Sequence, residues 1–358
     1  MKSFFAVTLT LLLGIGVFSP IFAQGEATAL FLLINPGARQ GGMGETGVAT
    51  ADDANAIYWN PAGLAFQYQN PATDKKGEAT LMHVNWLPQF NFSDLYYDYA
   101  AFRYHLEGIG MVGLAIQFMN YGENNQTDAA GNLIGTFNSN EMAFTGSYGL
   151  KLSNTVGLGV NLKYILSRLS PVVVDNERGK GVGSTFAVDL GVLWKTGFTG
   201  ERLSLGANLS NVGPKITFID SDQADPIPTN LRFGLAYKIL NSEFNRLSFV
   251  YDMNRLLVPR DEEDRDQSFL SYPVTAWGGD DFFKRLSHSI GLEYWYTNLI
   301  GLRAGYFYED PDYGDRKFYT FGGGVRISFI GVDFSYILAS VDDNPLADTI
   351  RFSLSATF

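Results

Sequence analysis

The chain has 358 residues, no cysteine and a formal net charge of −11 at pH 7. The lack of cysteine excludes disulfides and cysteine-bound metals, and the acidic balance argues against a nucleic-acid partner, because phosphate binding needs a basic surface. Aromatic residues make up 15% of the chain, glycine occurs 39 times, and no long apolar run follows the first 23 residues. This composition is typical of a transmembrane β-barrel.

The first 23 residues have the layout of a secretory signal peptide. Lys2 gives a positive start, residues 4–18 are apolar, and the small residue Ala23 precedes Gln24. The apolar run is shorter than a transmembrane helix requires. We therefore expect residues 1–23 to be removed from the exported protein.

Residues 24–76 lack the alternation of a strand and are rich in glycine. Because they precede the first strand, we expect them to begin on the periplasmic side and to fold into the lumen as a plug. Gly42, Gly44 and Gly47 match G-x-G-x-x-G, but a dinucleotide loop needs a strand before the motif and a helix after it. Pro61 would break that helix, so the glycines are interpreted as sites of close backbone packing.

From residue 77 onward, apolar residues recur at every second position, which is typical of β-strands. In the last segment, Ile350, Phe352 and Leu354 share one face, and Arg351 and Ser353 share the other. In a barrel the apolar face meets lipid and the polar face lines the lumen. The alternation predicts fourteen strands: 77–87, 95–106, 108–121, 137–152, 155–168, 182–197, 202–212, 229–240, 245–257, 286–297, 299–310, 316–329, 330–340 and 347–358.

The connections between these strands alternate in length. Those after even-numbered strands are a few residues at most, whereas those after odd-numbered strands are longer, up to the stretch 258–285. Short periplasmic turns and longer external loops have this pattern in outer-membrane barrels. We therefore predict an all-β, fourteen-stranded transmembrane barrel over residues 77–358, located in the cell outer membrane.

Several charged residues fall on the lumen-facing positions of this register. Since lipid cannot solvate them, we interpret them as internal ion pairs that hold the plug and close the lumen, with substrate conduction as the alternative. These residues are Lys163, Asp189, Arg232, Glu293, Arg303, Asp333 and Arg351. The same register places few large apolar side chains inward.

Catalytic and metal-binding patterns are weak. His288 lies between two serines, but neighbouring residues on a strand point to opposite faces, which argues against a His–Ser pair. The acidic run 261–266 lacks the sixth-position glycine and the distal glutamate of a calcium loop. We predict no catalytic residue, no metal and no cofactor.

The long stretch 258–285 combines apolar and acidic residues. An exposed apolar group with a charged rim suits protein recognition, although the same side chains could instead pack over the barrel mouth. The candidate cargo-binding residues are Leu270, Tyr272, Pro273, Val274 and Trp277. Further candidate loops are 122–136, 169–181 and 213–228.

The stretch 35–66, NPGARQGGMGETGVATADDANAIYWNPAGLAF, resembles the N-terminal region of the PorV/PorQ group, which is similar to FadL-type fatty-acid channels. In this resemblance Asn35, Pro36, Asn60, Pro61 and Ala62 belong to the plug or hatch. Later blocks resemble PorV in the same order and include NVGPKITF at 211–218, GLEYWYTN at 291–298 and PLADTIRFSLS at 345–355.

The resemblance implies a non-enzymatic part of the type IX secretion system of Bacteroidota. The implied partners are the C-terminal signal domains of secreted proteins, a large translocon barrel of the SprA/Sov type, a PorU-type sortase attachment complex and outer-membrane lipid. Two alternatives stay open. One is a FadL-type transporter of hydrophobic small molecules, and the other is a purely structural barrel.

Overall fold

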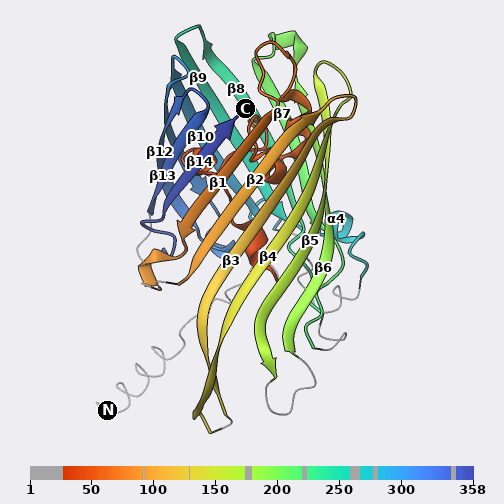
Figure 1. Ribbon diagram of the computed structural model, residues 1–358, viewed down its shortest axis with the longest axis vertical. Helices are drawn as coiled ribbons and strands as arrows, with labels where there is room; N and C mark the ends of the chain where they lie inside the picture. Colours follow the sequence, from red (N-terminus) through yellow and green to blue (C-terminus); the bar gives the residue numbers. More distant parts are fainter. Residues whose placement is uncertain are drawn as a thin grey trace, which may run out of the picture.

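The computed structural model describes residues 27–358 except 91, 93, 129, 174–179, 220–223, 259–266, 277–280 and 340–343. Fourteen antiparallel strands form a closed barrel in which β1 pairs with β14 (Figure 1). The strands are β1 (Gly77–Asn85), β2 (Tyr96–Leu106), β3 (Gly110–Thr127), β4 (Leu133–Lys151), β5 (Val156–Val173), β6 (Lys180–Lys195), β7 (Leu203–Val212), β8 (Asn230–Asn241), β9 (Asn245–Leu256), β10 (Leu286–Tyr296), β11 (Ile300–Tyr308), β12 (Lys317–Ile327), β13 (Ile330–Ala339) and β14 (Ile350–Thr357). The predicted fold class and all fourteen predicted strands are confirmed.

Short helices lie outside the strands. They are η1 (Leu30–Leu33), α2 (Ala38–Gly41), α3 (Ala56–Trp59), η2 (Pro61–Phe66), η3 (Pro88–Phe90), η4 (Gly197–Thr199), α4 (Tyr272–Thr275) and η7 (Pro311–Tyr313). Among the described residues, no helix is both long and apolar enough to cross a membrane. The expected signal peptide and the acidic run 261–266 fall outside the described residues.

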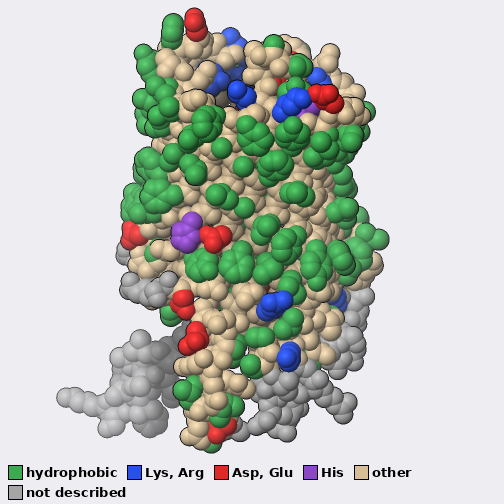
Figure 2. Space-filling view, in the orientation of Figure 1, with side chains coloured by type: hydrophobic (Ala, Val, Ile, Leu, Met, Phe, Trp, Pro, Cys, Tyr) green, Lys and Arg blue, Asp and Glu red, His purple; other side chains and the backbone are tan. Residues whose placement is uncertain are grey.

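The outer face of the barrel is apolar, as the alternation predicts. Leu162 and Phe186 are each 66% exposed, whereas Asp189 is fully buried. Figure 2 shows the resulting belt of hydrophobic side chains across the face in view. Polar side chains turned inward and apolar ones turned outward are the arrangement that a bilayer requires.

Two hairpins, β3–β4 and β5–β6, extend beyond the predicted strand ends. β5 runs to Val173 and β6 starts at Lys180, so both ends of the predicted loop 169–181 are strand. β3 runs to Thr127 and β4 starts at Leu133, so the prediction that 122–136 is a loop was wrong for most of its length. Their polar stretch, GENNQT at 122–127, carries no apolar alternation, and the register shifts between Asn120 and Gly122. Periodicity of apolar residues does not detect a strand that leaves the membrane, because neither of its faces meets lipid.

The N-terminal segment, residues 27–66, lies inside the barrel (Figure 1). Its described beginning is at the end with the long connections, where the Thr28 N–H donates to the Pro226 carbonyl at 3.0 Å. The segment then runs to the other end, where η2 packs on β4, β5 and β6. The expectation that it begins on the periplasmic side was therefore wrong. The segment traverses the lumen before β1 begins, and strand counting cannot detect this extra pass.

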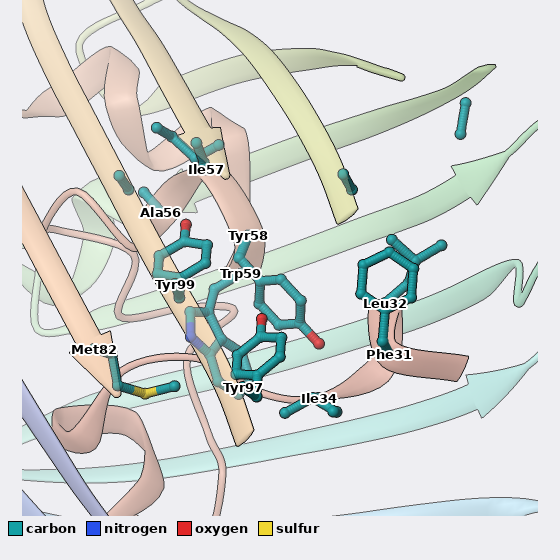
Figure 3. Close-up of a cluster of buried hydrophobic side chains, with 14 of the residues drawn as sticks. Phe31, Leu32, Ile34, Ala56, Ile57, Tyr58, Trp59, Met82, Tyr97 and Tyr99 are labelled. Carbon is teal, nitrogen blue, oxygen red and sulfur yellow. The ribbon is translucent and has the colours of Figure 1, made fainter. Parts of the chain in front are cut away.

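The inner wall has an apolar half and a charged half. On β1 and β2, the side chains of Met82, Tyr97 and Tyr99 are buried against Trp59 and other apolar residues of the N-terminal segment (Figure 3). The expectation of few large apolar residues inward was wrong for this half. These inward residues are shielded from water by the segment, so they pack as a protein core.

Candidate functional site in the barrel lumen and at its mouth

Arg39 is the main link between the N-terminal segment and the charged half of the wall. Its guanidinium forms two parallel hydrogen bonds to Glu293 on β10, each 2.8 Å long. It also contacts Asp53 of the segment, with 3.1 Å between Nη1 and Oδ2. Paired hydrogen bonds of this kind fix orientation as well as charge, so α2 is held at one position on the wall.

The ion pairs continue around the wall from Glu293. Arg303 on β11 lies 2.9 Å from Glu293 and 2.9 Å from Asp333 on β13. Asp333 also pairs with Arg326 at 2.6 Å. The side chain of Arg303 is fully buried, so its charge depends on these carboxylates for compensation.

A second link joins Glu45 of the segment to Arg351 on β14, with 2.6 Å between Oε1 and Nη2. The Asn35 amide donates to the other carboxylate oxygen of Glu45 at 2.7 Å. Burial alone would raise the pKa of Glu45, but the Arg351 charge and these hydrogen bonds outweigh it and lower the pKa below its ordinary value. Glu45 is therefore held as a carboxylate.

On the opposite side of the lumen, Lys163 lies 2.8 Å from Asp189. Asn161 donates to both Asp189 and the Ile57 carbonyl, at 2.7 Å each, which ties this pair to α3. Arg232 donates to the Tyr58 hydroxyl at 2.9 Å. The structure thus places all seven predicted lumen charges inside the barrel, each at most 5% exposed.

Four of the five predicted hatch residues are buried in the segment, and Asn35 is half-buried. The Asn60 amide donates to Val192 O of β6 at 2.9 Å and to Val48 O at 3.1 Å, and its Oδ1 accepts from the Ala62 N–H. Pro61 begins η2. The Pro36 carbonyl accepts from the Trp59 indole at 3.0 Å, so the two predicted hatch motifs are linked within the segment.

The G-x-G-x-x-G stretch passes close to the barrel backbone. Gly44 has φ +70°, and a Cβ there would lie 2.7 Å from Ile290 O and 2.8 Å from Tyr306 N. A Cβ on Gly42 would lie 3.0 Å from the Gly322 Cα. Glycine adopts the positive φ of Gly44 without strain, and it has no Cβ to clash with the nearby backbone. Both observations agree with the interpretation of these glycines as sites of close backbone packing.

Sequence reasoning missed Asp252 on β9. Its Oδ2 accepts from the backbone N–H groups of Gly47 and Val48, at 2.7 and 3.0 Å. The sequence could have indicated Asp252 as a lumen-facing charge, because the alternation of residues 245–257 places it on the inward face. It was missed because nothing in the sequence indicates that a carboxylate there will meet backbone donors rather than a cation.

The predicted cargo-binding residues differ in how far they are exposed to solvent. Leu270 and Val274 are exposed, at 67% and 75%, whereas Tyr272 is buried. Pro273 lies in α4, and Trp277 lies outside the described residues. Phe283, which sequence reasoning did not select, is 80% exposed near the same stretch.

A cavity of about 580 Å³ lies between the start of the N-terminal segment and the long connections. Apolar side chains form much of its wall, among them Leu33, Trp86 and Met119, and Arg316 adds a cation. Its volume falls in the range of small-molecule sites. Among the described residues, no group of three or more His, Asp or Glu side chains is placed to hold a metal ion.

A family model described as type IX secretion system protein PorV matches residues 24–263, more than half of the chain. The chain belongs to the PorV family. It is therefore a component of the type IX secretion system in the outer membrane, with partners in that system. In this setting the short turns are periplasmic and the long connections are extracellular.

Solved structures of the same fold include two toluene transporters. TodX of P. putida has 14% identity and a TM-score of 0.54, covering 90% of this chain and 99% of its own. TbuX of Ralstonia pickettii has 12% identity and a TM-score of 0.52, covering 90% of this chain and 98% of its own. No curated protein sequence matches the chain. At such low identity the likeness shows the barrel fold alone.

Proposed function

We propose that this PorV-family protein is a non-enzymatic cargo shuttle. It binds the C-terminal signal domains of exported proteins at its extracellular end and docks at a large translocon barrel of the SprA/Sov type. It then carries cargo to the surface attachment complex that contains a PorU-type sortase. Family membership supports a role in secretion, and the specific partners are part of the proposal.

The observation that carries this proposal is the filled lumen. The N-terminal segment is joined to the wall by Arg39–Glu293 on one side and by Asn161–Ile57 on the other. A protein substrate has no room to pass through a barrel occupied in this way. The extracellular loops remain as the surface on which cargo can be held, and Leu270, Val274 and Phe283 offer exposed apolar contacts there.

The test is capture of a purified C-terminal signal domain by the full-length protein in nanodiscs. We expect L270D/V274D to weaken binding by at least about tenfold, because charge is introduced into an apolar contact. The matched control is F244D, which changes an exposed apolar residue on the periplasmic turn between β8 and β9. Equal binding by L270D/V274D and the wild type would reject this surface.

A second candidate function is transport of hydrophobic small molecules. The 580 Å³ cavity with its largely apolar wall supports it. If this function holds, mass spectrometry of protein purified in mild detergent should find a bound lipid or aromatic compound that Leu33→Glu removes. Recovery of a translocon barrel and exported proteins, with no such compound, would favour the shuttle.

A further inference from the structure

The periplasmic mouth of the barrel contains a second cavity, of about 510 Å³. Arg39 of the N-terminal segment lines it, together with four cations of the barrel wall: Lys195 at the end of β6, Arg202 just before β7, Lys238 on β8 and Arg246 on β9. These four strands are consecutive neighbours in the sheet. Figure 2 shows Lys and Arg side chains gathered in a hollow at the top of the view.

The carboxylates that share this cavity already have other partners. Asp52 and Glu293 both bind Arg39. Asp74 accepts the backbone N–H groups of Gln69 and Asn70, at 2.6 and 2.7 Å. Asp74 is thus the one lining carboxylate that is not bound to Arg39, and its single charge cannot balance the four cations.

In the described part of the chain none of these four cations forms a salt bridge, and Asp52 and Glu201 attract Lys195 only at longer range. Lys195 lies over the ring of Phe66, with its Nζ 4.4 Å from the ring centroid. The Lys238 N–H donates to the Arg202 carbonyl at 2.9 Å, so these two like charges are cross-strand neighbours. Like charges side by side on a sheet are destabilising, and an anionic ligand would remove that cost.

The spread of the charges indicates the shape of that ligand. Adjacent strands lie about 4.8 Å apart, so four neighbouring strands distribute the cations over roughly 14 Å. One phosphate group can contact only part of such a row, whereas an extended chain with several carboxylates can contact all of it. Phe66, Leu193 and Trp295 in the same cavity add apolar contacts for a peptide.

We propose that the periplasmic mouth binds an acidic peptide segment of a periplasmic protein, held by Lys195, Arg202, Lys238 and Arg246. This site is separate from the proposed cargo surface, which lies at the other end of the barrel. The inference does not depend on cargo binding, and either can fail without the other.

The experiment measures fluorescence polarisation of a labelled hexaglutamate peptide with the full-length protein in nanodiscs. We expect saturable binding that weakens with added salt, because partly exposed charges are screened. K238Q/R246Q should weaken it by about tenfold. Both side chains are exposed, so the barrel should keep its fold, which heat-dependent gel mobility checks.

The matched control is K180Q/K215Q, which removes two cations from the extracellular end and should bind hexaglutamate as the wild type does. Failure of the wild type to bind hexaglutamate, or equal binding by K238Q/R246Q, would overturn the proposal. Displacement of the peptide by an equal concentration of inorganic phosphate would also overturn it, since that result indicates a site for a single anion. Hexalysine binding to a K238E/R246E variant, but not to the wild type, would add support.

Discussion

At the scale of single residues, Glu293 joins the N-terminal segment to the charged half of the wall. Glu293 is 5% exposed, and its carboxylate is shared between Arg39 of the segment and Arg303 of the wall. Two buried cations thus share this anion, and each has one further carboxylate in the interior, Asp53 for Arg39 and Asp333 for Arg303. Removing one member of a buried pair costs more than the pair contributes, because the remaining charge is left without a partner in a poorly solvating interior.

We predict that Glu293→Gln lowers the free energy of unfolding by about 3 kcal/mol, within the range for broken buried ion pairs. Urea unfolding in lipid vesicles, followed by tryptophan fluorescence, measures this loss. Glu243→Gln is the control, because Glu243 is an exposed carboxylate on a periplasmic turn. Equal losses in the two variants would contradict the role given to Glu293.

The Glu45–Arg351 pair predicts a pH dependence. The pKa of Glu45 is lowered in the folded protein, so its contribution to stability is fully present above the ordinary carboxylate pKa and is lost as the pH falls through the folded pKa. The difference in unfolding free energy between the wild type and Glu45→Gln should therefore be largest near neutral pH and shrink on acidification. A difference that stays constant between neutral and acidic pH would contradict the ion pair.

At the scale of elements, the fit of the N-terminal segment depends on backbone proximity. Gly44→Ala places a Cβ against the backbone at Ile290 and Tyr306, which side-chain rotation cannot relieve. We expect the segment to undock, so that protease added to detergent-solubilised protein cuts within residues 37–48. Gly108→Ala is the matched control, since Gly108 has φ +77° but a Cβ there meets no atom within 4 Å. Equal protease resistance in the two variants would count against close packing.

The strands were predictable because lipid imposes alternation on every residue that crosses it. The predicted start of the first strand, residue 77, is also the first residue of β1. The extensions of β3 and β4 were not predictable, because their polar residues lie outside the bilayer, where lipid imposes no alternation. The inward placement of Lys163, Asp189 and Arg351 followed from the alternation of the strands alone, but the pairing of Arg351 with Glu45 of the N-terminal segment did not. A partner depends on the path of a segment that has no period.

At the scale of the whole molecule, closure joins the first strand to the last. The Gly77 N–H donates to the Phe358 carbonyl at 2.8 Å, and the Phe358 N–H donates back to Gly77 at 2.9 Å. The Phe358 ring lies 6.1 Å from Phe102, measured between centroids, on the adjoining strand β2. The final residue thus holds the seam on its lipid side, where an open edge would leave backbone groups without partners.

We predict that Phe358→Ala lowers the yield of closed barrel, because the seam loses its aromatic contacts. Heat-dependent gel mobility separates closed from unfolded barrels in outer-membrane extracts. Phe198→Ala is the control, since Phe198 is 78% exposed on a periplasmic turn away from the seam. A similar yield for both variants would show that the seam closes without the terminal ring.

The traverse of the lumen by residues 27–66 also sets an order of events during biogenesis. The segment lies within a continuous wall, and the strand that follows it is one side of the β1–β14 seam. We therefore expect the wall to wrap around a segment that is already in position, because a barrel that closes first would leave Arg351 without Glu45 and Asp252 without its backbone donors. Residues 27–66 supplied later as a free peptide should not restore the native interior. The N-terminal segment is in this sense a template on which the barrel is completed.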